Sequence, residues 1–174
     1  MQFLTALECK TWCQERQIKL DDRGYPARGL NDKTSFRCAF PKSFTQFLWF
    51  AQFIEKTLQP RDNCLLWITE WGIWRSSENL HLYYKLRQAY GDNRLLEKAP
   101  GHIFQKFESS DLTTFLELSM LFGWGGYLLP TEGYSRGFIS HDEWAELIFE
   151  NPEDIESLKS QLVKAGINLV PVKR

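Results

Sequence analysis

The sequence has no hydrophobic run that approaches the roughly 20 residues a membrane-spanning helix needs, and no charged-then-apolar leader at its start. Cysteines are few, and none has the Cys-x-x-Cys spacing of zinc knuckles and redox sites; they are Cys9, Cys13, Cys38 and Cys64. We therefore expect buried free thiols rather than disulfides. Together these absences predict a cytoplasmic protein that does not enter a membrane.

An excess of charge of either sign is also absent. The 174 residues include 21 Lys and Arg and 22 Asp and Glu, which gives a formal net charge of −1. This balance provides no long-range field that favours nucleic acid or anionic lipid, so we expect neither as a partner. The charges are nevertheless uneven, because residues 108–156 contain 11 Asp and Glu and one basic residue, Arg136. This window predicts either an acidic docking surface or simply the solvated faces of several helices.

Motifs that carry chemistry are missing as well. Gly123-Trp124-Gly125-Gly126 follows an expected helix and leads into an expected strand, the reverse of the order in phosphate-binding loops. Glu78 and His81 are three residues apart on an expected helix, but a single such pair does not make a metal site. The Gly-x-Ser-x-Gly pattern of α/β hydrolases does not occur. We therefore expect no cofactor and no bound metal, and no residue is assigned a catalytic role.

The residues that are present give an ordinary apolar share of 43% with a high aromatic load of 7 Trp, 6 Tyr and 13 Phe. Apolar residues at helical spacing and capping residues predict helices over 4–17, 43–59, 76–90, 112–122, 140–149 and 152–165. Alternating or continuous apolar runs bounded by turn residues predict strands over 35–40, 64–69, 102–107, 126–130, 137–139 and 167–172.

The order of these elements indicates the fold class. Helices and strands alternate along most of the chain, which is typical of helices packed on both faces of a parallel sheet. We predict a three-layer α/β/α fold with a mixed, mostly parallel sheet, and an α+β fold as the alternative. No repeat and no long linker divides the chain, so residues 1–174 are expected to form a single domain.

A candidate ligand site follows from this fold. The segment Glu70-Trp71-Gly72-Ile73-Trp74-Arg75 follows the expected strand 64–69, and Lys42-Ser43 follows the expected strand 35–40. Ligands of open α/β sheets bind beyond the carboxyl ends of strands. If the two strands are parallel neighbours, a small-molecule pocket with Glu70 and Arg75 as polar anchors is lined by Lys42, Ser43, Glu70, Trp71, Trp74 and Arg75. The alternative is a solvated Glu–Arg pair with the tryptophans in the core.

Four segments between Leu65 and Trp144 carry a resemblance to a known family. They are LLWITEWGIWRSSENLHLYYKLRQAYGD, APGHIFQKFESSDL, LFGWGGYLLP and SHDEW, and together they cover under half of the chain. In these segments the chain resembles a bacterial protein family of unknown function. The resemblance implies a bacterial, cytoplasmic protein of one domain, and it supplies no activity, cofactor or catalytic residue.

The sequence therefore favours binding over catalysis. We predict a non-catalytic protein-interaction or immunity-like protein that binds a basic protein partner through an acidic face. The residues expected on that face are Glu132, Asp142, Glu143, Glu146 and Glu150. The alternative is a small-molecule-binding domain or enzyme with its pocket around Glu70 and Arg75. The sequence does not specify the oligomeric state or the partner.

Overall fold

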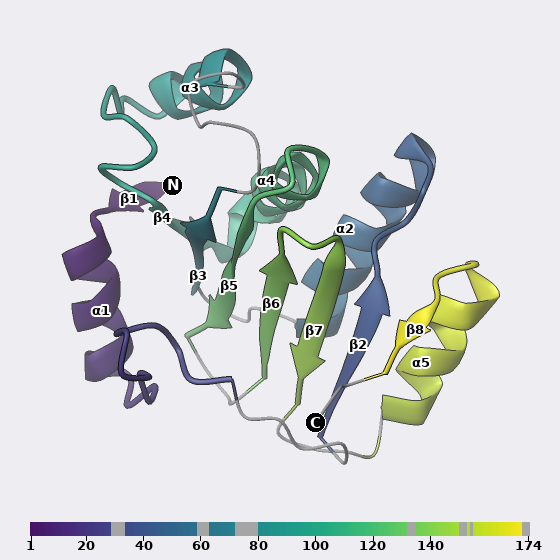
Figure 1. The fold of residues 1–174 in the computed structure, drawn as a ribbon. Helices are drawn as coiled ribbons and strands as arrows, with labels where there is room; N and C mark the ends of the chain where they lie inside the picture. The colour runs from purple at the N-terminus through teal and green to yellow at the C-terminus, as the bar shows by residue number, and fades with distance from the viewer. Residues whose placement is uncertain are drawn as a thin grey trace.

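A computed structural model of the chain describes residues 1–28, 34–58, 63–71, 80–131, 135–149, 153 and 155–171. In these residues eight strands form one sheet, in the order β1-β4-β3-β5-β6-β7-β2-β8 (Figure 1). The strands are β1 (Gln2–Leu4), β2 (Ser35–Ala39), β3 (Asn63–Glu70), β4 (Gly101–Gln105), β5 (Gly125–Pro130), β6 (Arg136–Ser140), β7 (Trp144–Ile148) and β8 (Leu169–Val170). The helices are α1 (Ala6–Glu15), α2 (Phe44–Leu58), α3 (Leu80–Ala89), α4 (Ser109–Leu121) and α5 (Ile155–Lys164), with a 3-10 turn at Lys106–Glu108.

Every strand pairing in the sheet is antiparallel, so the predicted mostly parallel sheet is wrong and the arrangement is α+β. The alternation of helix and strand suggested βαβ crossovers. Instead β4, which follows α3, returns beside β3 in the opposite direction. The strands β5, β6 and β7 follow one another as antiparallel neighbours without an intervening helix, which is the connectivity of hairpins.

The segment 140–149, predicted as a helix, forms a turn and the strand β7 instead. Ser140 and Glu143 have the spacing of a capping box, but Ser140 ends β6 and Glu143 has a left-handed φ of 62°. The Ser140 side chain accepts a hydrogen bond from the Asp142 N–H at 3.2 Å, which fixes a turn rather than a helix start. Ala145 and Leu147 then face the main core at a period of two, the period of a strand.

The main core lies on one face of the sheet. Side chains from α2, α3, α4 and α5 pack there against alternate residues of the strands, and Figure 1 shows α2 and α4 behind the sheet. The helix α2 is buried on one side through Phe50, Phe53 and Ile54, whereas Phe44 and Leu48 are exposed, so its dense aromatic spacing does not bury it on several sides. Among the described residues no helix is long and apolar enough to span a membrane.

The other face of the sheet is covered only in part. Trp12 and two cysteines of α1 pack there on Leu65 and Trp67, together with Tyr25, Tyr127 and Phe138. Beyond α1 this face carries charged side chains over aromatic rings. The Arg28 guanidinium lies 4.3 Å from the centre of the Phe138 ring, and that of Arg37 lies 4.3 Å from the centre of the Trp144 ring.

Two adjacent glycines of β5 allow it to approach β3 closely. A Cβ atom at Gly126 would lie 2.5 Å from the backbone oxygen of Trp67, and one at Gly125 would lie 2.5 Å from the Glu70 carboxylate. Real Cβ atoms do not reach such distances. At Gly126 the obstacle is rigid backbone, so only glycine fits there, whereas at Gly125 a Cβ atom would require the Glu70 side chain to move. The close approach falls in the middle of the sheet, where β3 and β5 are neighbours.

Replacing Gly126 with alanine is therefore expected to lower the free energy of unfolding by about 3 kcal/mol, because the new methyl group meets rigid backbone. Gly137→Ala is the matched control, since its Cβ would meet the end of the Leu58 side chain at 3.1 Å, which can move aside. We expect a loss of less than about 1.5 kcal/mol for the control. Urea denaturation measures both values, and equal losses would contradict the argument.

Candidate functional site

Exposed polar side chains from two distant parts of the chain meet at one end of the sheet. Glu70 ends β3, and His141, Asp142 and Glu143 form the turn after β6, which we call the acidic sheet end. β3 and β6 flank β5 and run in the same direction, so their final residues lie at the same end. His141 Nδ1 lies 2.8 Å from Glu70 Oε2, and its Nε2 lies 3.4 Å from Asp142 Oδ1.

Backbone contacts hold this cluster in place. Glu143 keeps its left-handed conformation while its carbonyl accepts a hydrogen bond from the Phe40 N–H at 2.8 Å. Trp71, which is half-buried, packs edge-on against the buried ring of Trp124, with 5.7 Å between the ring centres. The carboxylate of Glu70 occupies the space beside Gly125 that a Cβ atom would need. The cluster is thus anchored from β2, β3 and β5.

The two carboxylates determine the charge of the imidazole. The hydrogen bond to Glu70 raises the pKa of His141 above its usual value of 6.5, and the charges of Glu70 and Asp142 raise it further. Each ring nitrogen faces a carboxylate oxygen. An imidazole held in this way favours the protonated form, which has no lone pair to accept a proton, so it is poorly suited to act as a general base.

The raised pKa predicts a pH-dependent contribution to stability. Protonated His141 stabilises the folded state fully below pH 6.5, and this contribution is lost as the pH rises through the raised folded-state pKa. His141→Asn should therefore lower the stability of the protein more at pH 5.5 than at pH 8. Urea denaturation across this range tests the sign, and Glu70→Gln is expected to reduce the same pH dependence. A loss that is larger at pH 8 would contradict the assignment.

The described members of the predicted ligand site do not converge in one pocket. Lys42 and Ser43 are exposed at the same end of the sheet as Glu70. However, β2 is four strand spacings from β3, about 19 Å, so the two strands are not the parallel neighbours that the pocket requires. Trp74 and Arg75 lie outside the described residues. Glu70 and Trp71 therefore face His141 and Trp124 rather than Lys42 and Ser43.

The predicted acidic face is only partly assembled. Asp142 and Glu143 are exposed neighbours in the β6–β7 turn, whereas Glu132 and Glu150 lie outside the described residues. Glu146 is 0% exposed and forms an ion pair of 3.3 Å with Arg37 on the neighbouring strand β2, so its assignment to an exposed face is wrong. The helix predicted over 140–149 would have exposed Glu146, but the two-residue period of β7 turns it toward the sheet face that bears Phe138.

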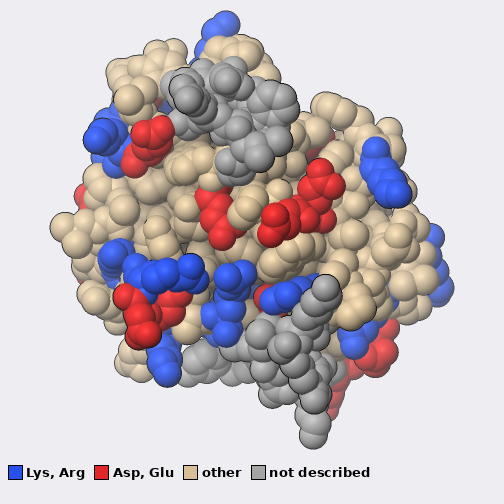
Figure 2. All heavy atoms as spheres, viewed as in Figure 1, with Lys and Arg blue, Asp and Glu red and all other residues tan. Residues whose placement is uncertain are grey.

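Other acids of the window 108–156 are dispersed over the fold. Glu108 is buried and accepts a hydrogen bond from the amino group of Met1. Glu156 lies on α5 and pairs with Lys159 at 2.7 Å. Figure 2 shows a group of carboxylates near the middle of one face and basic side chains gathered below it. In the part of the chain that the structure describes, the exposed carboxylates at the end of the sheet are thus Glu70, Asp142 and Glu143, two of which belong to the window.

A second cluster lies inside the main core and was missed by sequence reasoning. Four side chains, those of Tyr83, Arg87, His102 and Trp124, are at most 1% exposed. Each has at least one buried polar atom for which the described residues provide no hydrogen-bond partner. The Tyr83 ring contacts both His102 and Trp124, with ring centres 5.6 and 4.8 Å apart. Burial lowers the pKa of His102 to about 3, so this histidine is neutral. No local spacing in the sequence signals such a cluster, because tertiary packing creates it.

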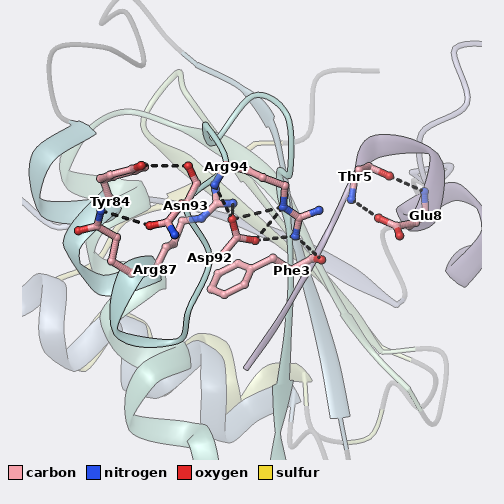
Figure 3. A network of polar contacts seen from close by, with 9 residues as sticks. Phe3, Thr5, Glu8, Tyr84, Arg87, Asp92, Asn93 and Arg94 are labelled. Carbon is pink, nitrogen blue, oxygen red and sulfur yellow. Dashed lines mark hydrogen bonds and ion pairs between the residues drawn. The ribbon is translucent and has the colours of Figure 1, made fainter.

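The charged partner of Arg87 is the carboxylate of Asp92, which also pairs with Arg94. Arg87 Nη2 lies 3.5 Å from Asp92 Oδ1, and the Arg87 guanidinium lies 4.8 Å from the centre of the Phe3 ring. Asp92 also accepts hydrogen bonds from Arg94, which in turn donates to the carbonyl of Phe3 at 3.0 Å (Figure 3). Asp92 therefore joins α3 to the first strand of the sheet through two arginines.

Substitution of Asp92 is expected to lower the stability of the protein more than substitution of its partner Arg87. Asp92→Asn leaves a buried guanidinium without a counter-charge and should lower the free energy of unfolding by about 3 kcal/mol. Arg87→Met removes the buried charge while Asp92 keeps Arg94, so the loss should be at most about 1 kcal/mol. Chemical denaturation of both variants measures the difference. A larger loss for Arg87→Met than for Asp92→Asn would contradict this ranking.

The cysteine side chains are also poorly suited to chemistry. All four cysteines are free and buried, and burial raises the pKa of Cys13 to about 11 and that of Cys38 and Cys64 to about 12, so the thiolate nucleophile is disfavoured. Within the described ranges no group of three His, Cys, Asp or Glu side chains is arranged to hold a metal ion. Comparisons with protein-family models, curated proteins and solved structures found no match. The functional assignment therefore rests on the geometry of the chain itself.

Proposed function

We propose that this protein is a non-catalytic recognition protein that binds a basic polypeptide partner at the acidic sheet end. The observation that carries the proposal is the exposed row Glu70–His141–Asp142, with Glu143 next in the same turn. Three carboxylates around one imidazolium leave an excess of negative charge at this end. Lysine and arginine side chains are the protein groups that complement such a surface.

The local geometry favours recognition over catalysis. The side chains of Asp142, His141 and Glu70 are 70%, 41% and 34% exposed, so water is not excluded from this end of the sheet. General acid–base or nucleophilic chemistry gains most from an enclosed site of low dielectric. Both nitrogens of His141 are already engaged by carboxylates, and the cysteine thiols are buried elsewhere.

Pre-organisation also supports a docking role. The turn is tied to β2 through the Glu143 carbonyl and to β3 through the Glu70 carboxylate. A partner that binds there does not have to order this turn, which lowers the entropic cost of association. Because the charges are exposed, the attraction should be screened over about 10 Å at 0.1 M salt, so association should weaken as the ionic strength rises.

A lysine- and arginine-rich peptide is the probe that tests this proposal. We expect it to shift the backbone NMR signals of residues 70 and 141–143, with an affinity that falls as salt is added, whereas a glutamate-rich peptide of equal length should not bind. Asp142→Asn and Glu143→Gln should each weaken binding several-fold.

The matched control is Glu156→Gln, which removes an exposed carboxylate on α5, away from the acidic sheet end. It should leave the affinity for the basic peptide unchanged. If the control weakens binding as much as Asp142→Asn, the peptide senses only net charge and the proposed docking site is wrong. Binding of the glutamate-rich peptide with equal affinity would also contradict the proposal.

A further inference from the structure

A hollow at the opposite end of the sheet is lined by basic side chains. It has a volume of about 420 Å³ and lies between the end of α1, the end of β5 and the start of β6. Its basic side chains are Arg16, Lys19 and Arg136, and the described residues that line it include no carboxylate. We infer that this hollow is a binding site for a small organic oxyanion, namely a phosphate monoester or a carboxylate with an apolar body.

The guanidinium groups provide the first part of the argument. Arg136 Nε and Arg16 Nε are buried, and neither has a hydrogen-bond partner within the described residues, although Arg16 Nη1 lies 3.4 Å from the Glu15 carboxylate. The carboxylate that acts on Arg136 most strongly is Glu146, but Glu146 makes its close contact, 3.3 Å, with Arg37 instead. Buried donors without acceptors are costly, and several positive charges around one hollow repel one another. An anion in the hollow relieves both costs.

The chain that carries these groups is fixed before any ligand arrives. The Arg16 guanidinium lies 4.2 Å from the centre of the Trp12 ring, and its Nη1 donates to the Trp12 carbonyl at 3.2 Å. The Lys19 carbonyl accepts a hydrogen bond from the Ala27 N–H at 2.8 Å, which ties the segment after α1 to the loop that follows. Pre-positioned cations bind an anion with less loss of side-chain freedom.

Gln17 provides an independent observation. It has a left-handed φ of 56° directly after the C-cap of α1, where the Ile18 N–H bonds the Cys13 carbonyl and the Gln17 N–H bonds the Gln14 carbonyl. This is the helix-ending motif in which glycine is preferred, because any side chain is strained there. The side chain present at this strained position lines the hollow, where its amide is available as a further donor.

The apolar wall of the hollow determines which kind of group the ligand carries beside its oxyanion. Ile18, Leu129 and Pro130 give the hollow an apolar side, opposite in character to its three cations. Arginine binds phosphate and carboxylate oxygens in a bidentate manner, and a hollow of this volume is within the range of small-molecule sites. A ligand with an oxyanion head and an apolar body fits both walls. Phenyl phosphate and benzoate are simple probes with these two parts.

Calorimetric titration tests the site directly. We expect saturable binding of phenyl phosphate or benzoate, tighter than that of inorganic phosphate, because only the first two have an apolar part. Arg136→Met should weaken binding about tenfold or more by removing a charge-assisted contact. Arg136→Lys keeps the positive charge but loses the bidentate geometry of the guanidinium group, so it should weaken binding less than Arg136→Met does. Amide NMR shifts at residues 131 and 135 should follow the same titration.

Arg23→Met is the matched control, since Arg23 is 71% exposed, pairs with Asp21 and does not line the hollow. Its affinity for the probes should equal that of the natural sequence. The inference fails if none of the three probes binds saturably, or if Arg23→Met weakens binding as much as Arg136→Met. Either result leaves the proposed docking of a basic polypeptide untouched, because that surface lies at the other end of the sheet.

Discussion

The close approach of β5 to β3 is the constraint on which the rest of the structure depends. Gly125 and Gly126 bring the backbone of β5 against Trp67 and Glu70 in the centre of the sheet, where a larger residue would collide. This contact sets an antiparallel register from which β6 and β7 continue as hairpin neighbours. It also leaves the Glu70 carboxylate room beside β5, within reach of the turn after β6. Packing in the middle of the sheet thereby defines the exposed cluster at its end.

The strand β6 connects two regions of opposite charge. It begins at Arg136, which lines the basic hollow, and ends at Ser140, directly before His141 of the acidic sheet end. The two regions lie at opposite ends of the same strand, and each consists of charges presented to solvent or to a hollow rather than aligned for a reaction. A rigid strand that separates positive and negative groups is suited to recognition by charge. This arrangement supports the proposed role as a recognition protein.

The local structure followed well from the sequence, and the tertiary arrangement did not. Apolar spacing predicted α2, and the helix predicted over 76–90 ends at Ala89, two residues before Gly91 with its left-handed φ of 82°. The direction of the strands was predicted incorrectly, because a helix between two strands is compatible with an antiparallel return such as that of β4. The segment after Ser140 was misread because one spacing, Ser140 to Glu143, suits both a helix cap and a tight turn.

In the candidate site, too, several individual residues could be predicted from the sequence, but their arrangement could not. Glu70, Asp142 and Glu143 were identified as functional candidates from composition and position, but their assembly around His141 depends on which strands are neighbours. Arg16 and Arg136 gave no signal, because they are 120 positions apart and only the packing of α1 beside β5 and β6 brings them to one hollow. Pairings across the sheet are set by long-range contacts, which a single sequence does not display.

The most direct test of this account is the pKa of His141, measured by NMR titration in a Gly125→Ala variant. A Cβ at position 125 would lie 2.5 Å from the Glu70 carboxylate and displace it from the imidazole. The account predicts that the pKa of His141 then falls toward its ordinary value of 6.5, while the protein stays folded. A pKa that stays at the value of the natural sequence would show that the glycine pair does not position the acidic sheet end, and would contradict the account.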